Sequence, residues 1–108
     1  DEAKVEFEAE PSEDVRLTGI AIAEHRLGNV EASQAALLEL VSSMGDQVLY
    51  QQGQINAQKG EIQLALELLG RARAIGDSGL IYARNDPYLD PLRSEPAFRQ
   101  LLASMGFD

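Results

Sequence analysis

The feature that most limits the fold of this chain is a pattern that repeats after 32 residues. Leu17 is matched by Leu49 and Gly28 by Gly60, and both pairs have this offset. Repeats of this length are typical of a helix–turn–helix unit, and one such unit cannot bury its apolar face alone. We therefore expect two units that stack within a single domain, which a length of 108 residues also favours.

Helical spacing of apolar residues covers most of the chain. Four helices are predicted, at about residues 13–27, 30–44, 47–59 and 61–75. Gly28, Gly45 and Gly60 stand where these helices end. Residues 77–93 contain Asp-Pro pairs that permit only a turn or two of structure, so an ordered connector is expected there, followed by a short helix within 94–106. Strand-like alternation is nearly absent, and the predicted fold class is all-α.

Aligned in this register, the two units can be compared position by position. The first unit supplies Leu17, Ala21, Gly28, Ser33, Leu37 and Leu40, and the second supplies Leu49, Gly53, Gly60, Ala65, Leu69 and Ala72. This pattern resembles the tetratricopeptide repeat (TPR) family, with an offset of 32 in place of that family's roughly 34 residues. The resemblance implies that the small residues Ala21 and Gly53, and Ser33 and Ala65, lie where the two helices of a pair approach closely. The stretch 86–102, DPYLDPLRSEPAFRQLL, resembles the closing segment of TPR arrays at the C-termini of bacterial signalling proteins, including relatives of nucleotide cyclases and kinases.

The resemblance implies a right-handed solenoid fragment of TPR-like helical hairpins with a C-terminal capping helix. The TPR-like domain would cover residues 11–108. It would consist of repeat one at about 13–44, repeat two at about 46–76, the connector at 77–93 and the capping helix at 94–106. The acidic tail at residues 1–10 would be the remnant of a preceding repeat helix, because Pro11 lies where the family's closing proline would fall. Since the chain begins with Asp1 rather than Met, it is expected to be a piece of a longer array.

The resemblance also implies a binding face, because the first helix of each TPR unit lines a concave groove that takes peptides. The candidate groove residues are Val15, Thr18, Ile22, His25 and Arg26 from the first unit, and Gln47, Tyr50, Gln51, Gln54 and Gln58 from the second. Gln51, Gln54 and Gln58 recur at helical spacing beside Tyr50, which would place amide donors and acceptors next to an aromatic ring. A solvated helix face explains this stripe equally well.

The same register indicates what kind of ligand the groove would take. Some TPR domains bind a peptide's terminal carboxylate at positions that hold Thr18, Ile22 and Gln51 here. Neither Thr nor Ile supplies positive charge, so we expect no carboxylate clamp and a neutral or apolar ligand. Val15 and Ile22 are expected to be exposed on the groove side unless a preceding repeat, a ligand or another subunit covers them.

Residue types that carry catalysis are scarce in this chain. It has no cysteine, which excludes disulfides, thiol nucleophiles and cysteine-ligated metals, and His25 is its single histidine. No nucleophile-elbow motif or oxyanion loop accompanies His25, and the acidic start contains no calcium-binding loop. We therefore expect no enzyme activity, no metal and no cofactor.

The charge of the chain limits its partners. Its net charge is −9, from 18 acidic and 9 basic side chains, and the resulting field repels nucleic acid and anionic membranes. Its apolar stretches are far shorter than the roughly 18 residues that a membrane span needs. The predicted function is a cytoplasmic module for protein–protein interaction that binds a peptide or partner protein. The alternatives are self-association as a homodimer, or a regulatory segment of a larger bacterial signalling enzyme.

Overall fold

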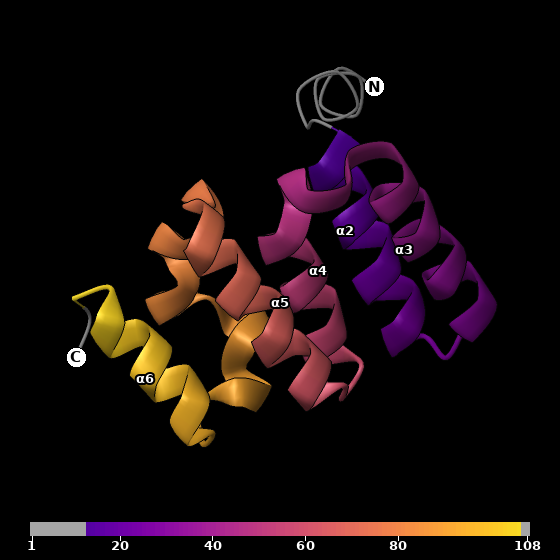
Figure 1. The fold of residues 1–108 in the computed structure, drawn as a ribbon. Coiled ribbons are helices and arrows are strands. Elements are labelled where there is room, and N and C mark those ends of the chain that lie inside the picture. Colours follow the sequence, from indigo (N-terminus) through magenta and orange to yellow (C-terminus); the bar gives the residue numbers. More distant parts are fainter. Residues whose placement is uncertain (1–12, 107–108) are drawn as a thin grey trace, which may run out of the picture.

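The computed structural model describes residues 13–106, and within this range the backbone forms helices and turns with no strand (Figure 1). The α-helices are α2 (Glu13–Arg26), α3 (Val30–Met44), α4 (Leu49–Gln58), α5 (Ile62–Ile75) and α6 (Pro96–Ser104). The 3-10 helices are η1 (Gly45–Val48), η2 (Ser78–Asn85) and η3 (Pro87–Leu92). The all-α prediction is confirmed, whereas the predicted acidic tail lies outside the described residues.

Two helical hairpins, α2 with α3 and α4 with α5, are the main packing units. Their turns have the same backbone conformation, with φ of +83° at Gly28 and +82° at Gly60. The residue after each glycine donates a backbone hydrogen bond to the carbonyl five residues earlier, at 2.8 Å in the first hairpin and 2.9 Å in the second. Because glycine adopts positive φ far more readily than other residues, the recurrence of glycine in the sequence reflects a recurring turn.

Small side chains let the helices of each hairpin approach closely, as the sequence predicts. A Cβ atom on Gly53 would lie 2.8 Å from Cδ2 of Leu69, which leaves no room for a side chain at this position. In the first hairpin Ala21 is fully buried, and Ser33 Oγ donates a 2.6 Å hydrogen bond to the Ala21 carbonyl oxygen. These small residues therefore set the distance between the paired helices.

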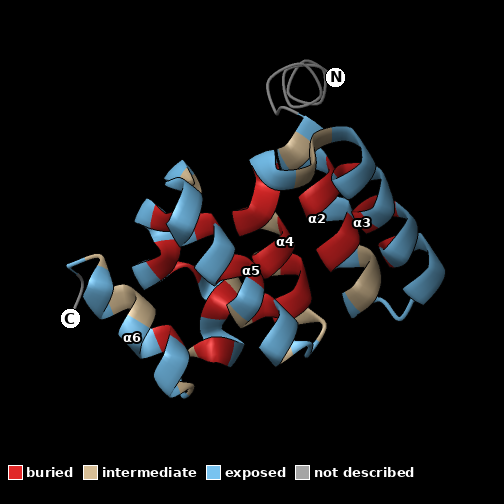
Figure 2. Ribbon diagram, in the orientation of Figure 1, coloured by how far each residue is buried: buried red, intermediate tan, exposed pale blue. Residues whose placement is uncertain are grey.

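The buried side chains form two clusters that meet at α4 (Figure 2). One cluster lies between α2 and α3, and Ile55 from α4 contributes to it. The other includes Leu49 and Leu69 from the second hairpin together with Phe98 from α6. Since α4 takes part in both clusters and contacts α2 directly, the two hairpins form one continuous stack.

The third predicted helix begins later than expected. The sequence pattern places its start at Gln47, whereas α4 begins at Leu49, after the 3-10 helix η1. Val48 has φ of −128° and ψ of 36°, outside the α-helical region, so η1 and α4 do not form one continuous helix. The Val48 side chain is buried in the α2–α3 cluster, and this burial fixes the bend.

The segment predicted as an ordered connector is wound into η2 and η3. Each begins after an aspartate whose carboxylate accepts a hydrogen bond from the backbone N–H two residues later, at 2.8 Å for Asp77 and 2.9 Å for Asp86. Pro87 and Pro91 lack an N–H donor and interrupt an α-helical ladder. The winding therefore stays in short 3-10 pieces.

The connector belongs to the packed core. Leu89 and Leu92 of η3 and Phe98 of α6 are fully buried. In this end of the molecule η3 packs along α4, and α6 packs on α5. The connector therefore lies directly beside the helix that the sequence predicts as the second half of the groove.

Candidate functional site

The predicted groove residues of α2 do not share one environment. Val15 is 53% exposed, while Thr18 is buried and its hydroxyl donates a 2.6 Å hydrogen bond to the Asp14 carbonyl oxygen. Ile22 is only 2% exposed, so the prediction that it needs a preceding repeat, a ligand or another subunit to cover it is wrong. Ile22 lies in the same core cluster as Ile55, and the second hairpin of this chain covers it.

The carboxylate of Asp86 accepts hydrogen bonds from two side chains of the predicted stripe on α4. The Tyr50 hydroxyl and Gln54 Nε2 both donate to Asp86 Oδ2, the latter over 2.7 Å, and Tyr88 N donates to Oδ1 over 2.9 Å. Asp86 is 8% exposed, so these donors replace its hydration. Burial, reinforced by the Asp86 carboxylate, raises the pKa of the Tyr50 hydroxyl far above its ordinary value, which keeps the hydroxyl protonated as a donor.

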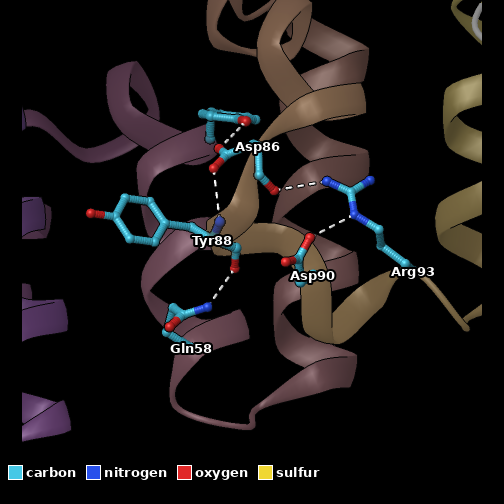
Figure 3. A network of polar contacts seen from close by, with 6 residues as sticks. Gln58, Asp86, Tyr88, Asp90 and Arg93 are labelled. Atoms are coloured by element: carbon cyan, nitrogen blue, oxygen red, sulfur yellow. Dashed lines mark hydrogen bonds and ion pairs between the residues drawn. The ribbon is translucent and has the colours of Figure 1, made fainter.

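Gln58 is bound to the connector as well. Its Nε2 donates to the Tyr88 carbonyl oxygen over 2.9 Å (Figure 3). Its Oε1 accepts a 2.6 Å hydrogen bond from Arg26 Nη2. The Arg26 guanidinium lies 5.6 Å from the centre of the Tyr88 ring. On the other side of η3, Arg93 donates to the Asp86 carbonyl oxygen and to the Asp90 carboxylate, both over 2.8 Å (Figure 3). Two of the three glutamines in the stripe, Gln54 and Gln58, therefore hold the connector.

An open groove remains between α2, α4 and η2, with a volume of about 410 Å³. We call it the tyrosine groove, and its lining residues are Val15, Thr18, Gly19, Tyr50, Gln51, Gln54, Gly79, Tyr82 and Tyr88. A second hollow of about 390 Å³ adjoins it and shares Tyr50, Gln54, Tyr82 and Tyr88. A Cβ atom on Gly79 would lie 2.8 Å from Cγ of Tyr50, so only glycine lets η2 come this close to α4.

The structure brings together five of the predicted site residues and separates the others. The tyrosine groove includes the predicted residues Val15, Thr18, Tyr50, Gln51 and Gln54. Gln47 is exposed on η1, and His25 is half-buried near the end of α2; neither lines the groove. The Nδ1 atom of His25 is buried and has no hydrogen-bond partner among the described residues.

Four groove residues were missed by reasoning from the sequence. Gly19 leaves open space in the wall of α2, and Gly79 lets η2 pack closely on Tyr50. Tyr82 and Tyr88 supply aromatic surface from the connector. Tyr82 is 66% exposed. The sequence does contain a signal for these residues, because the predicted connector has two tyrosines, Tyr82 and Tyr88.

A separate hollow of about 560 Å³ lies on the side where α3 and α5 flank α4. Its apolar walls include the exposed side chains of Leu38 and Val41 from α3 and Leu64 from α5, and Gln52 and Asn56 of α4 also line it. Exposed apolar patches of this kind often mark interaction surfaces. This surface was not predicted.

The described residues offer little for metal chemistry or membrane insertion. Between residues 13 and 106 there is no group of three or more His, Cys, Asp or Glu side chains that could hold a metal ion. No helix in the same range has the length and apolar character that a bilayer span requires. The arrangement of the tyrosine groove, an aromatic floor with amide groups, is suited to binding.

No family model matches the sequence, and neither a curated protein nor a solved structure matches it significantly. The geometry of the tyrosine groove therefore carries the functional proposal.

Proposed function

We propose that this chain is a TPR-like stack of helical hairpins that serves as a protein–protein interaction module and binds a peptide in the tyrosine groove. The observation that carries the proposal is the groove itself. It is open to solvent and lies between α2, α4 and the connector. Its walls combine apolar and aromatic side chains with amides. Peptide-binding faces need this combination of contact area and adaptable hydrogen bonding.

The TPR-like assignment is supported by the two hairpins. They have equivalent turns with positive φ at Gly28 and Gly60, and the small residues Ala21 and Gly53 occupy equivalent buried positions. The lining residues come from α2, α4 and the connector, and none of them belongs to the second helices α3 and α5. A groove lined by the first helices of the units is what the resemblance implies.

The size of the groove is appropriate for one or two side chains of an extended peptide. Binding pockets for small ligands usually have volumes of about 300–1,000 Å³, and the groove has about 410 Å³. Val15 and Tyr82 offer apolar surface at its edges, 53% and 66% exposed respectively. A bound peptide would cover both.

Selection from a displayed library of random peptides tests the proposal. We expect enriched peptides to bind the wild-type chain and to bind at least about tenfold more weakly to Gly19→Leu, because the new side chain would occupy space that the ligand needs. A Cβ atom at Gly19 meets nothing within 4 Å, so the variant should fold. Gly70→Leu is the matched control, because Gly70 is another open glycine, within α5 and outside the groove. Peptide binding that ignores Gly19→Leu, or a selection that enriches nothing, would contradict the proposal.

Self-association is a second candidate function, and the hollow between α3 and α5 favours it. Leu38 is 57% exposed and Leu64 is 43% exposed in its walls. If a second copy covers this surface, light scattering after size exclusion should give a mass above 11.8 kDa, and Leu38→Glu should restore the monomer. A monomeric wild-type chain across a wide concentration range would remove this candidate.

A further inference from the structure

Among the described residues, no lysine or arginine lines the tyrosine groove or its adjoining hollow. Acidic groups are present instead. The Asp86 carboxylate lies in the lining of the adjoining hollow, and Asp14 Oδ2 lies 3.4 Å from Nε2 of the groove residue Gln51. A third carboxylate, Asp77, accepts a 3.1 Å hydrogen bond from Tyr50 N. The field in the groove therefore favours a positive ligand.

Two arginines contact the lining from outside, and both are engaged. Arg26 donates to Gln58 and lies over the Tyr88 ring. Arg93 pairs with Asp90 and also donates to a backbone carbonyl. Both guanidinium groups are therefore bound to other groups of this chain.

An acceptor in the groove also lacks a donor. Oε1 of Gln51 is buried and has no hydrogen-bond partner among the described residues. Its amide Nε2 donates to the Asp14 carboxylate over 3.4 Å, so Oε1 is the atom of this side chain that still needs a donor. A buried acceptor without a donor is costly, and a ligand that supplies one gains that free energy on binding.

The third feature is aromatic. Tyr50, Tyr82 and Tyr88 all contribute to the groove, and Tyr82 is 66% exposed. The face of a tyrosine ring attracts a cation through its quadrupole. Carboxylates, a free acceptor and tyrosine faces therefore occur together at one place.

We infer that the tyrosine groove recognises a basic side chain, with arginine preferred, presented by a partner peptide; this inference rests on the proposed function. Arginine combines a permanent positive charge with a planar group of donors that stacks on aromatic faces. One of its N–H groups satisfies Gln51 Oε1 while the guanidinium lies against a tyrosine ring. A purely apolar side chain would leave that acceptor without a donor, and an acidic side chain would be repelled. This inference replaces the neutral or apolar ligand expected from the sequence.

The test uses two short capped peptides of glycine and serine that differ only at the central residue. One has arginine there and the other has citrulline, its neutral isostere. Both are titrated at millimolar concentration into the isotopically labelled chain and followed by amide chemical shifts. We expect the arginine peptide to shift the signals of Val15, Gly19, Gln51 and Tyr82, and the citrulline peptide to bind about fivefold more weakly.

Variants of the groove separate the contributions of acceptor, ring and space. Tyr82→Ala should weaken the arginine peptide about two- to fivefold, whereas Tyr82→Phe, which keeps the ring, should not. Gln51→Leu, which removes the acceptor at similar size, should weaken it about three- to tenfold. Gly19→Leu should abolish the shifts and Gly70→Leu should leave them unchanged.

The possible outcomes distinguish the two proposals. Equal binding of both peptides, abolished by Gly19→Leu, would overturn the preference for a basic side chain and support a groove that binds peptides. Failure of both peptides to shift the groove signals would overturn the basic-ligand inference, and the library selection would then decide the peptide-binding proposal independently. Enrichment of peptides without basic residues in that selection would also overturn the inference.

Discussion

Removing the Tyr50 hydroxyl should destabilise the fold because it removes a buried bond between α4 and the connector. Tyr50 is 3% exposed, and its hydroxyl donates to the carboxylate of Asp86, which is 8% exposed. A hydrogen bond to a charged group contributes about 1.5–3 kcal/mol, and its loss leaves the carboxylate with one donor fewer. We expect Tyr50→Phe to lower the free energy of unfolding by about 2 kcal/mol. Total stabilities of about 5–15 kcal/mol are usual, so the variant should remain folded.

Urea denaturation followed by far-ultraviolet circular dichroism measures this difference. Tyr82→Phe is the control, because Tyr82 is 66% exposed and its hydroxyl loses little contact; a change within about 0.5 kcal/mol is expected. If the two variants lose the same stability, the hydroxyl of Tyr50 does not hold the connector and the reasoning is refuted.

A double-mutant cycle with Asp86→Asn isolates the pair. The asparagine keeps an acceptor for Tyr88 N, which donates to Asp86 Oδ1 over 2.9 Å in the wild-type chain. It also removes the charge and places an amide NH2 donor where Oδ2 accepts from the Tyr50 hydroxyl. We expect Tyr50→Phe to cost less in the Asp86→Asn background, with a coupling free energy of about 1–2 kcal/mol. A coupling near zero would mean that the two side chains contribute independently.

Three further predictions follow from the same packing. Gly19→Ala, at an open position within α2, should stabilise the fold by about 0.5–1 kcal/mol, whereas Gly28→Ala should destabilise it by about 1–2 kcal/mol, because alanine tolerates φ of +83° poorly; urea denaturation gives both signs. Ile22→Ala should cost about 2–4 kcal/mol in the same assay, and Ile20→Ala, at a residue that is 38% exposed, should cost clearly less. The pKa of Tyr50 is raised in the folded state, so its contribution to stability is complete below the unfolded-state pKa of about 10 and is lost as pH rises beyond it. Stability measured at stepped pH should therefore fall more steeply above about pH 10 in the wild-type chain than in Tyr50→Phe.

The helices could be predicted from the sequence because their causes are local. α3 has the predicted bounds, Val30–Met44, since Gly28 and Gly45 interrupt the pattern on either side of it. The start of α4 was missed because the non-helical conformation of Val48 depends on burial against the first hairpin, which no local pattern records. Ile22 was missed for the same reason. Its burial depends on α4, which is distant from Ile22 in the sequence but packs against it in the structure.

The candidate site could be predicted only in part, because a third of its lining comes from the connector. Helical register correctly places Tyr50, Gln51 and Gln54 on one face of α4 beside α2. It does not indicate that Asp86 accepts hydrogen bonds from two of them. Polar pairing between distant segments depends on the path of the chain, and the prolines of the connector removed the periodicity that could have revealed the path.

The sequence spacing of hydrogen-bonded side chains does indicate the path of the connector. Two hydrogen bonds across the stack join residues that are 32 apart, which is the repeat offset: Arg26 with Gln58, and Gln54 with Asp86. In the structure η3 packs along α4, as α4 packs along α2, and α6 packs on α5. The 3-10 winding of η3 hides this packing from a search for apolar α-helical periodicity, because its period is shorter. Tyr50 and Gln54 donate hydrogen bonds to Asp86 at the start of η3. The surface that the proposed ligand could contact therefore lies toward Gln51, α2 and η2.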